Sequence, residues 1–140
     1  MSHQLMFSRL LRYDTRQPGI NVPITLKLGN LYADIAAKLD TGCTDCIFER
    51  AHGEALELVI ESGSLKRFRT ATGNFSAYGH MVTLAVEDFE FESLVYFAAD
   101  DFFDRNVVGQ HGFLNHLLVG LDDNAGLMYL NDNADSFANG

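Results

Sequence analysis

The stretch AKLDTGCTDC, residues 37–46, allows two incompatible interpretations of this chain. Its last four residues form a C-x-x-C pair, a pattern typical of metal sites and redox-active thiols. Its central D-T-G follows an apolar segment, which favours an acid placed on a tight turn at a strand end. The first interpretation makes the chain a thiol protein, and the second makes it a carboxylate enzyme.

The thiol interpretation lacks the context that it needs elsewhere in the chain. A structural zinc site requires four ligands, and no histidine shows a paired ligand spacing that would complete Cys43 and Cys46. A thioredoxin-type couple belongs to a βαβ unit, and the alternating pattern of such a unit is missing. We therefore interpret both cysteines as small buried side chains that alternate on a short strand, and expect no metal ion and no cofactor.

Length and charge limit the class of protein. The chain has 140 residues, of which 47% are hydrophobic, so it fits one domain with its own core. Ten Lys and Arg against nineteen Asp and Glu give a net charge of -9, which disfavours nucleic acid and anionic membranes as partners. No apolar run approaches the roughly eighteen residues of a membrane span, and the N-terminus does not resemble a signal sequence. We expect a soluble, cytoplasmic protein.

Most of the chain carries β-strand signals. Alternating and apolar runs flank turn residues at Gly29-Asn30, at Thr72-Gly73-Asn74 and at the D-N-A-G of residues 123–126, which predicts three hairpins. A further strand is expected in residues 89–99. Short helical segments are expected in residues 48–60 and 113–118. The predicted organisation is an N-terminal segment (1–17), one mostly β domain (18–130) and a polar C-terminal tail (131–140).

Three elements in this order carry a family resemblance. They are Asp40-Thr41-Gly42 after an apolar strand, a hairpin with its tip near Gly73-Asn74, and Val107-Val108-Gly109 leading into Phe113-Leu114. This arrangement resembles the retropepsin-like aspartic proteases, single-domain relatives of the retroviral proteases, over roughly residues 18–130. The resemblance implies a small closed β-barrel-like domain with a flap hairpin and one or two short helices.

The resemblance also implies roles for individual residues. Asp40 would be the catalytic acid, with its loop supported by Thr41, Gly42, Cys43, Val107, Val108 and Gly109. The substrate would meet Asp45 and the flap residues Thr72, Gly73, Asn74, Phe75 and Tyr78. Three of these assignments have an alternative: Asp40 as an ordinary turn aspartate, Asp45 as a solvated loop acid, and Tyr78 as a cross-strand packing residue.

The number of D-T-G elements bears on assembly. Hydrolysis of a peptide by carboxylates alone needs two of them sharing a proton, and the chain has a single D-T-G and no D-S-G. The second acid would then be Asp40 of another copy, which predicts a homodimer acting as an aspartic endopeptidase on extended polypeptide. The alternatives are a non-catalytic peptide-binding or dimerisation module of the same fold, and a thiol-dependent protein.

Overall fold

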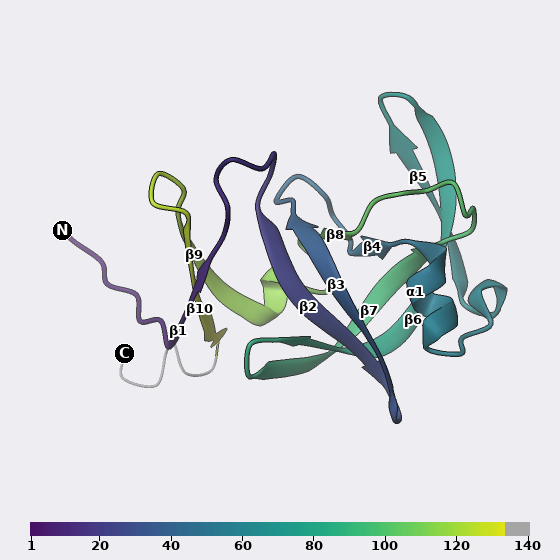
Figure 1. Ribbon diagram of the computed structural model, residues 1–140, viewed down its shortest axis with the longest axis horizontal. Coiled ribbons are helices and arrows are strands. Elements are labelled where there is room, and N and C mark those ends of the chain that lie inside the picture. Colours follow the sequence, from purple (N-terminus) through teal and green to yellow (C-terminus); the bar gives the residue numbers. More distant parts are fainter. Residues whose placement is uncertain (134–140) are drawn as a thin grey trace.

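The computed structural model describes residues 1–133, which form two β-sheets with short helices between the strands (Figure 1). The strands are β1 (Arg9–Arg12), β2 (Asn21–Leu28), β3 (Leu31–Leu39), β4 (Ile47–Phe48), β5 (Ser64–Thr70), β6 (Gly73–Val86), β7 (Phe89–Ala98), β8 (Val107–Val108), β9 (Leu117–Asp122) and β10 (Leu127–Asp132). The helical segments are α1 (Arg50–Ala55) and the 3₁₀ turns η1 (Ile60–Ser62) and η2 (Leu114–His116). The chain is mostly β, as predicted.

The larger sheet closes on itself. Its strand order is β2-β3-β8-β4-β7-β6-β5, and β2 pairs with β6 as well, so six strands form a ring from which β5 projects. Alternate residues of β2, namely Val22, Ile24 and Leu26, are buried inside this ring, while their neighbours face outward. The expected closed, barrel-like domain is confirmed.

The β2–β3 hairpin forms where the turn residues predicted it. Leu28 pairs with Leu31, which leaves a two-residue turn, and Gly29 has φ +59°. A glycine with positive φ at the first turn position suits the right-handed twist of the flanking strands. Strand β3 of this hairpin ends at Leu39, directly before Asp40.

The second sheet lies at one end of the barrel and has the order β1-β10-β9 (Figure 1). Strands β9 and β10 form the predicted hairpin, with Gly126 at φ +69° in the turn. Strand β1 was not predicted; it lies inside the expected N-terminal segment and pairs with β10 from Arg9↔Leu130 to Arg12↔Leu127. Asn131 and Asp132 of the expected tail belong to β10, and residues 134–140 lie outside the described part of the chain.

The helical segments are shorter than the ranges predicted from the sequence, 48–60 and 113–118. In α1, Gly53 is buried so closely that a Cβ atom there would lie 2.5 Å from Ile60 Cδ1 and 2.8 Å from Phe97 Cγ. The segment expected as one or two helical turns after Phe113 is a single 3₁₀ turn, because the chain enters β9 at Leu117. No helix among residues 1–133 is long and apolar enough to cross a membrane.

The β5–β6 hairpin projects from the barrel at the end opposite the small sheet (Figure 1). Thr70 pairs with Gly73, so the two turn residues are Ala71 and Thr72 rather than Gly73 and Asn74. Gly73 is the first residue of β6 and has φ +142°, a backbone conformation that favours glycine. The predicted hairpin is therefore present with its tip displaced toward the N-terminus.

Candidate active site

The loop that follows β3 is placed by the short strand β8. Lys38 and Leu39 run parallel to Val107 and Val108, and the Asp40 N–H extends this ladder by donating to the Val108 carbonyl at 3.0 Å. Strand β8 also pairs with β4, so it lies between the two ends of the loop. The apolar-apolar-glycine element thus holds both sides of the D-T-G turn.

Asp40 organises the turn around its own side chain. The Gly42 N–H donates to Asp40 Oδ1 at 2.9 Å, and the Cys43 N–H donates to the Asp40 carbonyl at 3.2 Å. This is an Asx turn, in which a side-chain carboxylate substitutes for a backbone acceptor. Asp40, Thr41 and Gly42 remain exposed, so the carboxylate is held at the surface by the Gly42 N–H.

Gly109 allows β8 and the loop to approach each other. The Gln110 N–H donates to the Cys43 carbonyl at 2.9 Å, and the His111 N–H donates to the Thr44 carbonyl at 2.8 Å. A Cβ atom at position 109 would lie 2.5 Å from the Asp45 carbonyl oxygen and would also overlap the Cys43 carbonyl oxygen. Glycine is therefore required here by a close backbone contact.

A cavity of about 200 Å³ lies between this loop and the β5–β6 hairpin. Its lining residues come from the loop, the hairpin and the segment before β8: Asp40, Gly42, Cys43, Ile47, Phe68, Arg69, Thr70, Phe75, Phe103, Arg105 and Val107. Within residues 1–133, Asp40 contributes the single carboxylate of this lining. The cavity thus combines an apolar part with one exposed acid and two arginines.

An aromatic cluster of Phe68, Phe75, Tyr96 and Phe103 joins the hairpin to the barrel. Phe68 stacks on Phe75 at 5.1 Å between ring centroids and meets Tyr96 edge-on at 5.5 Å. Phe103 packs against Phe75 at 4.7 Å. Such pairs add about 0.5–1.5 kcal/mol each beyond the burial of their area, and those with Tyr96 and Phe103 hold the hairpin against the barrel.

Asp45 forms the second connection between loop and hairpin. Its side chain accepts hydrogen bonds from Thr44 Oγ1 at 3.0 Å and from Lys66 Nζ of β5 at 2.7 Å. Asp45 is only 6% exposed, which is not the position of a solvated loop acid. The hydrogen bond to Asp45 raises the pKa of Lys66, and the Lys66 ammonium also lies over the rings of Phe68 and Tyr96.

Both cysteines are free and belong to the loop rather than to a strand, which corrects our expectation of a short strand. Cys46 is fully buried in the core, and its burial raises the pKa of the thiol to about 12. Cys43 is half-buried against the cavity, and burial also raises its pKa. Because a thiolate is the nucleophile and metal ligand, both groups are poorly suited to thiol chemistry near neutral pH.

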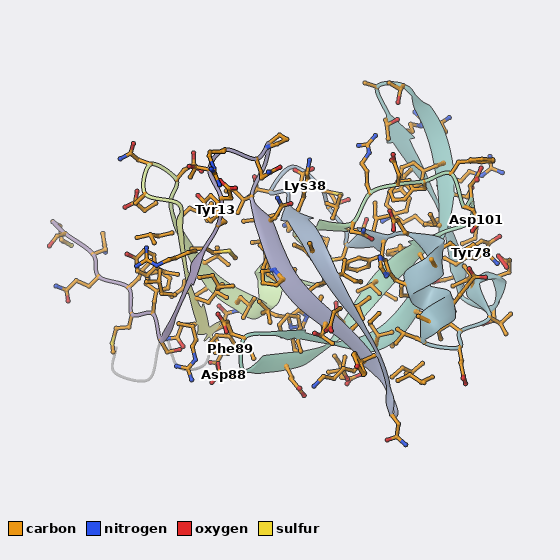
Figure 2. All side chains as sticks on the ribbon, viewed as in Figure 1. Tyr13, Lys38, Tyr78, Asp88, Phe89 and Asp101 are labelled. Atoms are coloured by element: carbon orange, nitrogen blue, oxygen red, sulfur yellow. The ribbon has the colours of Figure 1, made fainter. Side chains whose placement is uncertain are left out.

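The other residues singled out from the sequence fall into three places. Phe75 lines the cavity, whereas Thr72, Gly73 and Asn74 line a neighbouring hollow that shares Thr70, Phe75, Phe103 and Arg105 with it. Val108 is buried beneath the loop. Tyr78 lies near the base of the hairpin, packed against the main core and outside the cavity lining (Figure 2).

Sequence reasoning missed Lys66, Phe68, Arg69, Phe103 and Arg105. Phe68 and Phe75 carried a detectable signal, because two aromatic residues at matching distances from a hairpin turn meet across the strands. Lys66 and Arg105 carried none, since their neighbours in space are distant along the chain.

A sequence model of the aspartyl protease family matches residues 22–122, which include the D-T-G loop, the hairpin and β8. The chain belongs to the aspartyl protease family. A search of curated proteins found no match.

Solved structures support the same fold for this aspartyl protease family member. A retropepsin-like aspartic protease from Rickettsia conorii superposes with a TM-score of 0.64 at 16% identity, covering 86% of this chain and 96% of that one. The retroviral protease-like domain of Ddi1 from Leishmania major gives a TM-score of 0.54 at 17% identity, covering 82% and 96%. The fold is therefore retropepsin-like.

We predict that Gly109→Ala destabilises the protein strongly. The added methyl group meets the backbone carbonyls of Cys43 and Asp45, and the Cys43 carbonyl cannot move away without loss of its hydrogen bond from the Gln110 N–H. Unfolding should therefore become easier by on the order of 3 kcal/mol. Gly29→Ala is the control, because its methyl group would meet nothing within 4 Å and would bear only the positive-φ cost of about 1 kcal/mol. Urea denaturation of both variants measures the difference, and equal losses would contradict the role given to the close contact.

We predict that Asp45 and Lys66 are energetically coupled. Lys66→Met leaves a buried carboxylate without its cation and should cost on the order of 2 kcal/mol, moderated because the lysine side chain is 44% exposed. Adding Asp45→Asn should restore part of the loss, giving a coupling of about 1 kcal/mol or more in a double-mutant cycle. The exposed Arg9–Asp88 pair is the control and should couple weakly. Additive losses at positions 45 and 66 would show that the pair does not tie the hairpin to the loop.

Proposed function

We propose that the protein is a homodimeric aspartic endopeptidase that hydrolyses extended polypeptide with two Asp40 carboxylates. The observation that carries this proposal is the state of Asp40. Its carboxylate accepts a hydrogen bond from the Gly42 N–H, is exposed in a cavity beside the hairpin, and is the single carboxylate of that cavity within residues 1–133. One such group cannot both accept and supply a proton, so a second copy of the chain must provide the partner.

The chemistry follows from two like charges in one site. Two carboxylates close together cannot both ionise freely, so the pair holds one proton and titrates as a unit. The ionised member accepts a proton from a water molecule, whose oxygen attacks the carbonyl carbon of the peptide. The protonated member supplies its proton to the carbonyl oxygen. The carboxyl that took the proton from water gives it to the amide nitrogen, and the carbon–nitrogen bond breaks to release the amine. A hydroxyl of the tetrahedral intermediate returns its proton to the other carboxylate, so the product is a carboxylic acid and the pair again holds one proton.

The surrounding residues have supporting roles in this proposal. Thr41 is exposed beside Asp40, where its hydroxyl can bond across the two-fold axis to the partner loop. Gly42 lines the cavity without a side chain and leaves room for the substrate backbone. The β5–β6 hairpin acts as a flap, and an extended peptide beneath it is bound largely through main-chain hydrogen bonds.

Removing the acid tests the activity. Asp40→Asn keeps the shape of the side chain but removes the base, so kcat/KM on a cleaved peptide should fall by at least ~10²-fold while the fold is retained. Asp34→Asn, an exposed acid on the same strand, is the matched control and should cleave normally. A variant at position 40 that cleaves at the wild-type rate would assign the activity elsewhere, and a wild-type protein that binds peptide without cleaving it would favour the non-catalytic alternative.

Mixing chains tests whether the site is shared. We expect a species of about twice the chain mass of 15.6 kDa, and each active site should need Asp40 from both chains. With equal amounts of wild-type and Asp40→Asn chains allowed to exchange, random pairing leaves about a quarter of the dimers with both acids, and activity should fall to about that fraction of an all-wild-type sample. Retention of about half would mean that each chain works alone. Exchange with Asp34→Asn chains should leave the activity unchanged.

A further inference from the structure

The cations of this chain divide into paired and unpaired groups. Arg9, Arg16, Lys27, Arg50 and Lys66 each form an ion pair with a carboxylate. Arg69 and Arg105 form no ion pair and no side-chain hydrogen bond within residues 1–133, and both line the cavity that contains Asp40. Two guanidinium groups without an acidic partner therefore border the place where substrate would lie.

The charge of the cavity differs in sign from that of the whole chain. The chain carries a net charge of -9, so an acidic peptide gains nothing from the overall field. Within residues 1–133, the lining of the cavity holds two arginines against Asp40 alone. In the proposed dimer the two Asp40 groups share a proton, so the two copies of each arginine outnumber the negative charge of the acids.

The lining also has an apolar part. Ile47, Phe68, Phe75 and Phe103 surround the space beside Asp40, and this space measures about 200 Å³. A side chain that fits here needs an apolar stem to contact the rings and an anionic end to meet the guanidinium groups. Arginine pairs with carboxylates through two parallel hydrogen bonds, and such bonds are strong where water is partly excluded.

The second hollow supports Arg105 as the main contact. Arg105 lines both the cavity and the neighbouring hollow, so it lies at the boundary between these two spaces. Asp104 lines the neighbouring hollow but not the cavity, and it forms no ion pair with Arg105. The guanidinium of Arg105 thus remains available to a substrate group.

We propose that this cavity is a specificity subsite for an acidic substrate side chain, glutamate above all, recognised by Arg105 with help from Arg69. The proposal rests on the proposed function and names the substrate class of that site. Because the two-fold axis of the dimer repeats the cavity, the preference should occur at equivalent positions on both sides of the scissile bond.

The experiment compares matched peptides on one enzyme. A cleaved peptide is varied so that Glu or its neutral isostere Gln occupies each position on either side of the scissile bond, and kcat/KM is measured for each pair. At the position that enters the cavity, Glu should be favoured about tenfold to a hundredfold, the range for a hydrogen bond between charged groups. Arg105→Gln should reduce this ratio toward one, and Arg69→Gln should reduce it in part. The ratio within one protein is insensitive to a loss of folded enzyme.

Arg67→Gln is the matched control. Arg67 lies on the same strand as Arg69 and is likewise unpaired within residues 1–133, but it lines neither hollow. Its removal should leave the Glu/Gln ratio unchanged, and Arg105→Glu should shift the preference toward Lys at the same position.

Failure of this inference is separable from failure of the proposed function. Binding of the Glu and Gln peptides to the Asp40→Asn variant, followed by fluorescence anisotropy, measures recognition without cleavage and should show the same preference. Equal treatment of Glu and Gln by an active enzyme would overturn the subsite and leave the protease intact, as would a preference that survives both arginine substitutions. A wild-type protein that fails to cleave but binds the Glu peptide through Arg105 would overturn the proposed activity alone.

Discussion

The close contact between Gly109 and the loop after β3 is the constraint on which the rest of this site depends. The carbonyls of Cys43 and Thr44 accept hydrogen bonds from the two residues that follow Gly109. Gly109 itself lies so close to the carbonyl oxygens of Cys43 and Asp45 that no side chain fits at its position. Strand β8 is only two residues long, yet it pairs with β3 on one side and β4 on the other. The D-T-G turn is therefore held at both ends. The backbone of Asp40 is hydrogen-bonded to β8, while its side chain is exposed.

The hairpin is linked to this rigid loop by two different kinds of interaction. The aromatic cluster supplies contact area that does not depend on charge, whereas Lys66 and Asp45 form a directional pair with one partner buried. A buried carboxylate is costly without a cation, so the pair disfavours arrangements in which the base of β5 leaves the loop. The pair lies near the base of the hairpin, away from the turn at Ala71-Thr72, so it would not hinder the movement of the tip that we propose for a flap.

The net charge of the whole chain and the charge of the cavity differ in sign. Its net charge of -9 keeps copies and anionic surfaces apart at long range, whereas the proposed dimer would bring two acids together. In the proposed dimer a shared proton would remove most of the cost at the Asp40 pair, and Arg69 and Arg105 would add positive charge to the same cavity. The groups that would ease assembly are thus the ones to which we assign the preference for an acidic substrate.

The sequence by itself determined the local features of this protein. The β2–β3 and β9–β10 hairpins formed where Gly29 and Gly126 supply positive φ, because a turn depends on adjacent residues. The turn at D-T-G and its support by V-V-G could be predicted, because each motif requires particular small or apolar residues at fixed spacing. Only the tertiary structure decided that β1 pairs with β10 and that η2 is a single turn before β9. It also decided that Lys66 pairs with Asp45 and that Arg105 lines the same cavity as Asp40. These depend on closure of the barrel, which brings together residues far apart in the chain, and no local propensity encodes which of them meet.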